Sequence, residues 1–519
     1  MFSRIYGAVL FGLNGCLITV ETDIANGLPS FDIVGLATVA VKEAKERVRT
    51  AVKNSGLAFP VRRITVNLAP ADMKKEGAAL DLPIAVALLV SSGQIAPESC
   101  EDSVFIGELS LDGLIRPTVG VLSMVIAAKE RGMRTVYVSP ENGDEALLCE
   151  GITVYEAETF AVLSDHLRKI HCLSPSSSKM LQEEDKEYHN DFSEVQGQAV
   201  AKRVMEIAAA GGHNLLMTGP PGSGKSMLAK RMPTILPPMT LNESLEVTRI
   251  YSVAGILSKA GRITERPFRS PHHTVSAAGL IGGGSVPKPG EVTLSHNGVL
   301  FLDELPEFSR SVLEVLRQPL EDGDVRIVRA RASLAYPASF ILIAAMNPCP
   351  CGYLHDKDHV CTCSAGEIRK YVRKISGPLL DRIDLHVTVE RPLYSELSSS
   401  QRQESSAAIR ERVTAAANIQ AMRLKPYGIL RNGLMGHREI RETCPLTSEG
   451  KELAARIFQH LKLSPRGFDR LIKVARTIAD LAGSDVIEAC HITEAAAYRD
   501  TVQRLSLIHI SEPTRLRRI

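Results

Sequence analysis

The sequence predicts an α/β protein made of several domains, and three observations lead to this prediction. Strand-like apolar runs alternate with helical patterns over most of the 519 residues. A glycine-rich loop joins one of the apolar runs to a helical run. The part before the C-terminal tail carries helical patterns alone, and a chain of this length has room for about two to four domains.

The composition excludes a disordered or fibrous chain. Apolar residues make up 44% of the sequence and charged residues 23%, as in ordinary globular proteins. The last fifteen residues hold three Arg and one Glu, which accounts for the whole formal charge of +2. Contact with nucleic acid would therefore depend on local basic patches and not on bulk positive charge.

Residues 1–172 are expected to form an α+β domain. The opening run MFSRIYGAVLFGLNGCLITVETD is interrupted by Gly12, Asn14 and Gly15, which favours a strand, a turn and a second strand over a signal peptide. A helix is predicted over 41–56, ending at Gly56. Its buried face is predicted to consist of Val41, Ala44, Val48 and Ala51. No run of eighteen apolar residues occurs, so we expect no membrane span.

Composition divides the rest of the chain. Residues 173–190 are rich in Ser and then in charge, which indicates an exposed linker. A second domain is expected over 191–390, and a separate helical domain, rich in Ala, Glu and Arg, over 391–504. The stretch 505–515, LSLIHISEPTR, resembles the translation of an adapter used in sequencing libraries. We therefore interpret residues 505–519 as an artefact outside the native fold.

The most specific motif is GPPGSGKS, which fits the P-loop pattern G-x-x-x-x-G-K-[ST]. It consists of Gly219, Pro220, Pro221, Gly222, Ser223, Gly224, Lys225 and Ser226. It follows the apolar run NLLMTG and precedes the helical run MLAKRM, so a chance Gly/Pro turn is a poor alternative. Backbone N–H groups would surround the phosphates of ATP, Lys225 would reach the β- and γ-phosphates, and Ser226 would bind Mg²⁺.

Two later strands are predicted to end in polar residues that complete this site. In GVLFLDE the buried run ends at Asp303, expected to bind Mg²⁺, and Glu304, expected to activate the attacking water. The strand FILIAAMN ends at Asn347, which could sense the γ-phosphate. Alone, an acidic pair or an Asn at a strand end is more often a turn former.

Together with these motifs, the strings DFSEVQGQ, SPHHTVSAAGLIGGGSVPKPGE, AAMNPCPCGY and SGPLLDRIDLHV resemble the ComM/YifB family of Mg-chelatase-like AAA+ ATPases. The resemblance covers nearly all of residues 1–504. It implies a P-loop AAA+ ATPase core, a C-terminal helical lid over 391–504, ATP and Mg²⁺ as cofactors, and a homo-hexameric ring.

The resemblance also implies roles for three further residues. Asn347 would be sensor 1, Arg382 an arginine finger acting on the neighbouring subunit, and Arg466 sensor 2. A salt-bridge arginine is the alternative for Arg382. Arg470 and Arg476 lie on the same predicted helix as Arg466 and could replace it.

The N-terminal domain resembles the Lon-protease-like fold, related to the second domain of ribosomal protein S5. At the position of the protease nucleophile this sequence has Ala79, within KEGAALD, and at the position of the catalytic Lys it has Leu122. A Ser–Lys mechanism needs an activated hydroxyl beside a base. A non-catalytic scaffold is therefore favoured over a protease, unless another residue such as Ser123 supplied the nucleophile in a different geometry.

Two loops are candidates for contact with DNA in the channel of a ring. GDVRIVRARASLAYPASF predicts a β-hairpin with Arg326, Arg329 and Arg331 near its tip. A hairpin edge protected by charge is the alternative. AAGLIGGGSVPKPGE is an inserted glycine-rich loop that carries Lys288.

Six of the ten cysteines are scattered, which indicates a reducing compartment such as the cytoplasm. The other four, Cys349, Cys351, Cys361 and Cys363, form a C-x-C pair on each side of a nine-residue gap and could hold a structural Zn²⁺. The usual spacing is C-x₂-C, so His355 or His359 could replace one thiolate, and reduced thiols or a disulfide are the alternatives. His272 and His273 are expected to be loop or interface residues.

Three functions follow from these observations. The first is an ATP-driven helicase or translocase that promotes branch migration of DNA during recombination or natural transformation, with DNA and recombination proteins as its partners. The second is a chelatase-like ATPase that remodels a protein partner. The third is a peptidase or unfoldase, against which Ala79 argues.

Overall fold

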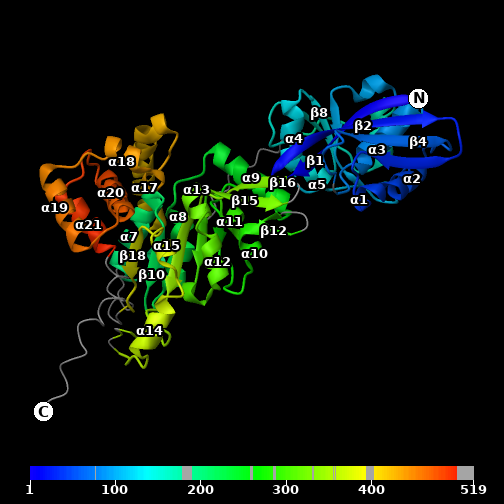
Figure 1. Cartoon of the computed structure of the whole chain (residues 1–519). Coiled ribbons are helices and arrows are strands. Elements are labelled where there is room, and N and C mark those ends of the chain that lie inside the picture. Colours follow the sequence, from blue (N-terminus) through cyan, green and yellow to red (C-terminus); the bar gives the residue numbers. More distant parts are fainter. Residues whose placement is uncertain are drawn as a thin grey trace, which may run out of the picture. The chain divides into compact units, whose positions relative to one another are not determined.

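The computed structural model describes residues 1–75, 77–177, 190–257, 261–284, 288–329, 332–354, 356, 358–392 and 403–499 (Figure 1). Most of the expected linker and all of residues 505–519 lie outside this part of the chain. The chain forms two compact units. Unit 1 contains Met1–Asp185 and Leu241–Ile263, and unit 2 contains Lys186–Thr240 and Thr264–Ile519.

Unit 1 is built on a seven-stranded mixed sheet with the order β3-β4-β2-β1-β5-β8-β9. Its strands are β1 (Phe2–Phe11), β2 (Asn14–Ala25), β3 (Ser30–Val34), β4 (Arg63–Ala69), β5 (Ser103–Phe105), β8 (Thr135–Val138) and β9 (Thr153–Glu156). A separate short pair consists of β6 (Glu108–Leu109) and β7 (Ile115–Arg116). The helices are α1 (Val39–Lys42), α2 (Ala44–Asn54), α3 (Asp81–Ser91), η1 (Pro97–Cys100), α4 (Val121–Glu130), α5 (Pro140–Ala146) and α6 (Phe160–Leu167).

Two local predictions for unit 1 are confirmed. The N-terminal run forms the antiparallel hairpin β1–β2, in which Phe11 pairs with Asn14 and Gly12 takes a positive φ in the turn. The predicted helix is present mainly as α2, and its expected apolar face is buried. It ends before Gly56, whose φ of 74° is left-handed and is strained for other residues.

Helix α3 passes through the core of unit 1. All of its residues are buried, which explains why it is apolar on every side and shows no polar face in the sequence. Its one buried charge, Asp81, accepts two hydrogen bonds from the guanidinium of Arg47, at 2.6 and 3.0 Å. This pairing satisfies a carboxylate that burial alone would disfavour.

Helix α9 (Leu241–Ala254) belongs to unit 1, although it follows the P-loop helix in the sequence. It packs against α4, and the Ser252 hydroxyl donates a hydrogen bond to the buried carboxylate of Glu145. That carboxylate also accepts from the Leu122 backbone N–H at 2.7 Å. Arg249 donates to the Asn14 side chain at 3.2 Å. The chain therefore passes between the two units three times, a feature for which the sequence offered no sign.

Unit 2 is built on a five-stranded parallel sheet with the order β11-β14-β17-β10-β18. Its strands are β10 (Leu215–Thr218), β11 (Phe268–Arg269), β14 (Val299–Leu302), β17 (Ile341–Met346) and β18 (Leu385–Thr388). Its helices up to β18 are η2 (Phe192–Glu194), α7 (Ala199–Gly211), α8 (Lys225–Ile235), α10 (Ala277–Ile281), α11 (Glu291–Leu294), η3 (Leu305–Glu307), α12 (Arg310–Val315), α13 (Pro319–Asp322), α14 (Ala365–Val372) and α15 (Gly377–Leu380).

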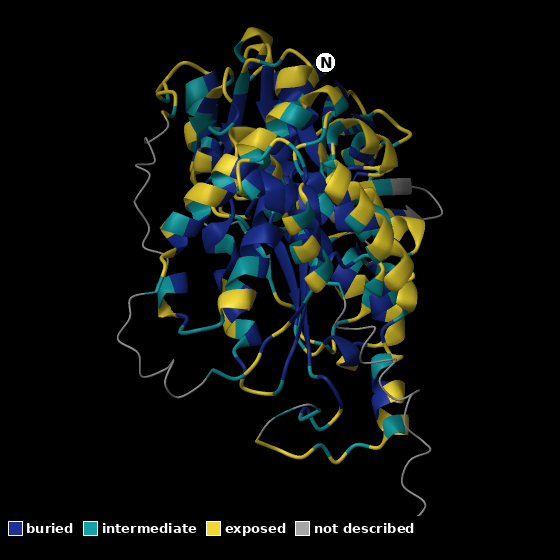
Figure 2. Ribbon diagram, turned by 90° about the vertical axis from the view of Figure 1, so that its left-hand side faces the viewer, coloured by how far each residue is buried: buried dark blue, intermediate teal, exposed yellow. Residues whose placement is uncertain are grey.

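The central strands of unit 2 are apolar along their whole length because helices cover both faces of a parallel sheet. Every residue of β10, β14 and β17 is buried. Figure 2 shows buried residues concentrated on the strands, with exposed residues on the outer faces of the helices. Polar residues can appear only where such strands end, so the edge formed by their carboxyl ends is the place for a site.

Two antiparallel pairs leave this sheet. The predicted hairpin is confirmed as β15 (Asp324–Arg329) and β16 (Ala332–Pro337), with Arg329 opposite Ala332. In the glycine-rich loop, β12 (Gly282–Gly283) pairs with β13 (Lys288–Pro289).

The C-terminal helices share one hydrophobic cluster with the sheet of unit 2. They are α17 (Ser406–Leu424), η4 (Lys425–Tyr427), η5 (Asn432–Leu434), α18 (His437–Thr443), α19 (Ser448–His460), α20 (Pro465–Leu481) and α21 (Ala489–Ala497). Helices α17 and α20 pack against α7, which itself packs on β18. Composition separates these helices from the core in the sequence, but their apolar faces are buried against it.

Among the described residues, no helix combines the length and apolar character that crossing a membrane would require.

Candidate nucleotide-binding site

Three loops of unit 2 leave the sheet at the same edge. Strands β10 and β17 are parallel neighbours with Thr218 opposite Met346, and β14 lies beside β17 with Leu302 opposite Ala344. The residues that directly follow these strands are the P-loop, the Asp303–Glu304 pair and Asn347. The sheet thus brings Lys225 and Asn347, which are 122 residues apart in the chain, to the same edge.

Three P-loop glycines lie at positions where the backbone geometry disfavours a side chain. Gly222 and Gly224 have φ values of 76° and 91°, in the left-handed region that side chains disfavour. A Cβ atom at Gly219 would lie 2.2 Å from the carbonyl oxygen of Val389, so only glycine fits there. Helix α8 begins at Lys225, directly after the loop, and its N-terminal N–H groups and dipole favour a bound phosphate.

Lys225 lies inside the loop. Its ammonium donates to the carbonyl oxygens of Gly219 at 2.8 Å and Pro220 at 2.9 Å, and to Oδ1 of Asn347 at 3.4 Å. Burial lowers the pKa of Lys225, while the nearby carboxylates of Asp303 and Glu304 oppose that shift. Lys225 and Asn347 are therefore close enough to contact the same phosphate group.

Ser226 and Asp303 form the second half of the site. The Ser226 hydroxyl donates to Oδ2 of Asp303 at 2.5 Å, across the gap between α8 and the end of β14. A hydroxyl and a carboxylate at this spacing are oxygen ligands of the kind that Mg²⁺ uses beside nucleotide phosphates. These two side chains could hold the metal.

Glu304 has a strained backbone and an exposed side chain. Its φ is 51°, a left-handed value that non-glycine residues seldom adopt, and its N–H donates to Oδ1 of Asp303 at 2.9 Å. The side chain is 58% exposed. The exposed carboxylate is accessible to a water molecule.

His273 lies beside Glu304, with 3.7 Å between Nδ1 of the imidazole and Oε2 of the carboxylate. The imidazole also packs on His272 and against the edge of Phe308. The sequence predicts a loop or interface role for this histidine and gives no sign of its position next to Glu304. Strand order is the signal that could have found it, because His273 follows β11 and β11 pairs with β14.

Arg382 and Arg466 meet at a second place in unit 2, on Glu321. Arg382 forms a close ion pair with the Glu321 carboxylate and donates to the carbonyl oxygen of Pro378 at 2.7 Å. Arg466 approaches the other carboxylate oxygen at 3.6 Å. The hydrogen bond from Arg382 is the main cause of the lowered pKa of Glu321. No sequence pattern indicated Glu321, whose carboxylate contacts both arginines.

The two alternatives to Arg466 have other partners. Arg470 lies 3.4 Å from the buried carboxylate of Asp384. Arg476 is 1% exposed and binds Asp480 and two backbone carbonyls at the end of its own helix. Of the three, Arg466 alone is mostly exposed, at 71% of its side chain.

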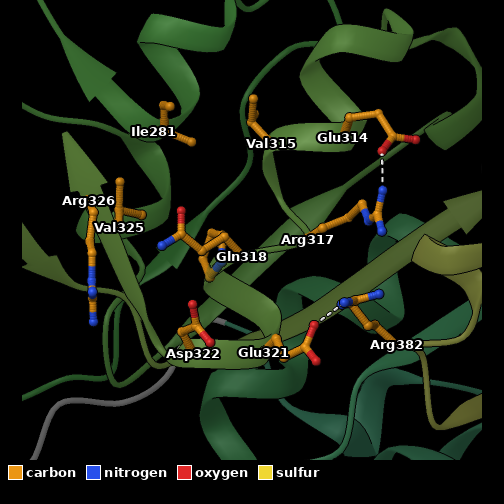
Figure 3. Close-up of a pocket in the computed structure, with 11 residues that line it drawn as sticks. Ile281, Glu314, Val315, Arg317, Gln318, Glu321, Asp322, Val325, Arg326 and Arg382 are labelled. Atoms are coloured by element: carbon orange, nitrogen blue, oxygen red, sulfur yellow. Dashed lines mark hydrogen bonds and ion pairs between the residues drawn. The ribbon is translucent and has the colours of Figure 1, made fainter. Parts of the chain in front are cut away.

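Arg382 lines a pocket of about 430 Å³ (Figure 3). Helices α12 and α13 and strand β15 form its walls, and polar side chains occupy much of them. Figure 3 shows Arg317 paired with Glu314, Arg382 paired with Glu321, and Arg326 on the opposite wall. The Nε atoms of Arg317 and Arg382 are buried without a hydrogen-bond partner within the described part of the chain.

The candidate DNA contacts are described only in part. Arg326 is exposed on β15 and lies 3.3 Å from Asp324 of the same strand. Arg329 is the last residue of β15, but its side chain is not described, and Arg331 lies outside the described residues. Lys288 is exposed at the start of β13.

The four clustered cysteines come together immediately after Asn347. All four Sγ atoms lie within 4.8 Å of one another, with 3.3 Å from Cys349 to Cys351 and 3.7 and 3.6 Å from these two to Cys361. Four thiolates around one Zn²⁺ would be separated by about 3.8 Å. The unusual C-x-C spacing therefore does not prevent a tetrahedral arrangement.

Of the two histidines considered as replacement ligands for Zn²⁺, the structure describes only His359. His359 stacks on Tyr353 and contacts Asp356, away from the thiol cluster. His355 lies outside the described residues.

In unit 1, the two positions compared with a protease active site are apolar and buried. Ala79 is 6% exposed and Leu122 is fully buried, and both belong to the same hydrophobic cluster. Ser123 is 1% exposed and cannot reach a substrate in this fold. These positions therefore provide packing and no nucleophile.

Three family models match the chain. They are described as magnesium chelatase, subunit ChlI, over residues 191–397, subunit ChlI of Mg-chelatase, over 20–142, and magnesium chelatase, subunit ChlI C-terminal, over 403–499. The magnesium-chelatase 38 kDa subunit of Cereibacter sphaeroides is 23% identical over 218 residues, which cover 39% of this chain and 59% of that protein.

Full-length relatives are more similar. The uncharacterized protein YifB of Escherichia coli is 42% identical over 511 residues, covering 98% of this chain and 99% of that protein. The competence protein ComM of Haemophilus influenzae is 40% identical over 506 residues, covering 96% of this chain and 98% of that protein. An uncharacterized protein of Mycobacterium tuberculosis is 42% identical over 504 residues, covering 96% and 99%.

Proposed function

The chain belongs to the ComM/YifB family of Mg-chelatase-like AAA+ ATPases, and we propose from this that it is a ring-forming ATP-driven motor that acts on DNA. Its reaction would be ATP hydrolysis coupled to helicase or translocase movement, which promotes branch migration during recombination or natural transformation. The convergence of Lys225, Ser226, Asp303 and Asn347 at one sheet edge is the observation that carries the ATPase part.

Each residue of this edge would have a separate task. The P-loop amides and Lys225 would bind the phosphates, and Ser226 and Asp303 would hold Mg²⁺, which would offset the negative charge of the phosphates. Glu304, whose side chain is exposed, would orient the attacking water and accept its proton. Asn347 contacts the γ-phosphate or the water from the neighbouring strand end.

Arg382 and Arg466 would act on the nucleotide of a neighbouring subunit in a homo-hexamer. Both are engaged with Glu321, and within the described residues neither makes a hydrogen bond to the P-loop or to Asp303. A second copy of the chain could bring its γ-phosphate to this pair, where the positive charges would stabilise the transferring phosphoryl group.

DNA is the proposed substrate for two reasons. The relative ComM carries the name competence protein, and this supports a role in the uptake and integration of DNA. The sequence segment 324–337 carries Arg326, Arg329 and Arg331, and the glycine-rich loop carries Lys288. Such cations can follow a phosphate backbone without reading its sequence.

We propose a non-catalytic role for the N-terminal domain, with the Lon-protease-like fold as its nearest structural class. Helix α9 ties this unit to the segment that follows the P-loop helix, through Ser252 and Glu145. Movement of α8 during hydrolysis would thereby be transmitted along a short stretch of chain.

The four cysteines would hold a structural Zn²⁺ ion. Their sulfur positions fit a tetrahedral thiolate site, and Zn²⁺ is the metal that such sites usually take.

A second candidate function is remodelling of a protein partner, as in a chelatase. The matches to the ChlI models over three segments favour it. The two candidates differ in the partner, because the ATPase site is the same in both.

ATP hydrolysis with and without a four-way DNA junction tests the proposal. We expect the junction to stimulate hydrolysis, and Glu304→Gln to abolish both rates. Replacing Arg326, Arg329 and Arg331 together by Ala should remove most of the stimulation. Hydrolysis that depends on Glu304 but ignores DNA would favour the protein-remodelling function instead.

A further inference from the structure

The cysteine cluster lies against the P-loop, although 128 residues separate Cys349 from Pro221. Between Cys351 and Tyr353, Gly352 adopts a φ of 88°. A Cβ atom there would lie 2.6 Å from Cδ and 2.8 Å from Cγ of Pro221, and 3.9 Å from the side chain of Asn347. The backbone of the cysteine loop therefore touches the P-loop so closely that no side chain fits between them.

Arg391 contacts the same P-loop residue from another direction. Its guanidinium donates to the carbonyl oxygen of Pro221 at 3.4 Å and lies over the ring of Tyr353, 5.7 Å from its centre. It also lies 3.9 Å from the carboxylate of Asp356. Arg391 follows β18, so it links the cysteine loop to the sheet as well as to the P-loop.

The segment between the two C-x-C pairs is organised by its own contacts. Tyr353 stacks on His359 with 4.7 Å between ring centres, and Asp356 accepts hydrogen bonds from the backbone N–H groups of Asp358 and His359. The four sulfur atoms lie together where the ends of this segment meet, and the N–H of Cys351 donates to the sulfur of Cys363 at 3.4 Å. A metal ion would close the loop.

The loop that carries the four cysteines, residues 349–363, begins just after strand β17 and Asn347. Asn347 directly follows β17 and receives a hydrogen bond from Lys225, and Cys349 follows two residues later, fully buried. A shift of the loop would therefore move both the wall of the P-loop at Pro221 and the sensor at Asn347.

We propose that the four-cysteine metal centre braces the nucleotide site, so that the affinity for ATP depends on the metal. This inference rests on the proposed function, because it takes Zn²⁺ at the cysteines and ATP at the P-loop as given. Without the metal, four thiols no longer hold Gly352 and Arg391 against Pro221. Ordering the P-loop when ATP binds would then cost free energy, and the affinity for ATP would be lower.

The test uses the purified full-length protein. Zinc content is measured by elemental analysis, and affinity is measured by titration with a fluorescent ATP analogue in excess Mg²⁺. The same titration follows removal of zinc with a zinc-selective chelator and again after zinc is restored. We expect about one bound zinc per chain, and a dissociation constant that rises about tenfold without zinc and recovers with it.

Two variants separate the metal from the contact it supports. Cys361→Ser removes a ligand and should reproduce the effect of the chelator. Gly352→Ala keeps all four cysteines but forces a side chain into Pro221, so it should weaken ATP binding while zinc remains bound. Cys490→Ser is the matched control, because Cys490 is exposed and outside the cluster. Circular dichroism checks that each variant is folded.

The outcomes are distinguishable. Absence of zinc from folded protein that binds ATP normally would overturn the metal centre. Bound zinc whose removal leaves ATP affinity unchanged would overturn the coupling and leave the proposed ATPase intact. Failure of the zinc-loaded protein to bind the ATP analogue would refute the proposed function itself.

Discussion

Units 1 and 2 both place helices against a sheet, but they differ at the positions where chemistry would occur. In unit 1, the two positions compared with a protease nucleophile and base are Ala79 and Leu122, buried in one hydrophobic cluster. In unit 2, the ends of adjacent parallel strands bring Lys225, Asp303 and Asn347 to one edge.

The difference shows that a fold supplies positions and that side chains decide whether they become a site. Apolar residues at positions 79 and 122 close the core of unit 1 and exclude water. Polar residues after β10, β14 and β17 remain partly solvated, because the sheet stops there and loops take over. The predictions below test this contrast, from the largest expected effect to the smallest.

Replacing the proposed finger, Arg382→Ala, should lower the rate of ATP hydrolysis by about three to five decades, because the transferring phosphoryl group would lose a positive charge. Steady-state hydrolysis at saturating ATP measures this effect. The exposed Arg373→Ala is the control and should keep the activity of the parent protein.

Mixed assemblies decide whether Arg382 acts on a neighbour. Arg382→Ala subunits mixed with Lys225→Ala subunits should regain part of the activity, since each supplies what the other lacks. If mixtures stay as inactive as the separate variants, Arg382 does not act between subunits and the site of unit 2 is complete within one chain.

The substitution Glu304→Gln should slow hydrolysis by about two to four decades, because the amide cannot accept the proton of the attacking water. ATP binding should be retained, since within the described part of the chain no hydrogen bond or ion pair joins Glu304 to the P-loop, and titration with the fluorescent analogue checks this. Glu307→Gln, at a nearby exposed ion pair with Lys374, should have little effect. An equal loss of hydrolysis rate in both variants would mean that the negative charge of this region matters, and not Glu304 itself.

The substitution Ser252→Ala removes a hydrogen bond between α9 and the rest of unit 1. We expect the free energy of unfolding to fall by about 1–3 kcal/mol, because the buried Glu145 carboxylate loses a partner. For a unit of this size the corresponding thermal transition should fall by several degrees, at about 2–4 °C per kcal/mol. Thermal unfolding monitored by circular dichroism measures the shift, with Asn242→Ala on the exposed face of α9 as control. An unchanged transition would show that α9 is not anchored through Ser252.

The smallest effect is expected for Ala79→Ser. Position 79 belongs to an apolar cluster, and the position compared with the catalytic base holds Leu122, so we expect no peptidase activity and ATP hydrolysis within about twofold of the parent. Cleavage of a casein substrate, followed by fluorescence, is the measurement. Peptidase activity that a serine-directed reagent blocks would place a catalytic site in unit 1 and remove the contrast between the two units.

Much of the candidate site was predictable from short stretches of sequence. The P-loop between strand and helix, and the Asp303–Glu304 pair after VLFL, each combine residue type with local structure that a few neighbouring residues determine. The hairpin over 324–337 and the N-terminal strand pair were predictable for the same reason. Alternation of residue types and turn glycines act over short distances along the chain.

Other features required the order of strands. His273 lies beside Glu304 because β11 pairs with β14, and nothing within SPHH specifies that pairing. Helix α9 carries an ordinary helical pattern, which says that one face is buried but not that unit 1 buries it.

The sequence by itself determined which chemical groups this protein has for binding nucleotide and metal, because glycines, carboxylates and thiols at short spacings restrict the local backbone directly. Tertiary structure alone decided which of these groups meet. Glu321 contacts both Arg382 and Arg466, and Gly352 touches Pro221, across separations of 61 to 145 residues in the chain. Such contacts depend on the burial of whole strands and helices, a cooperative property that no local pattern encodes.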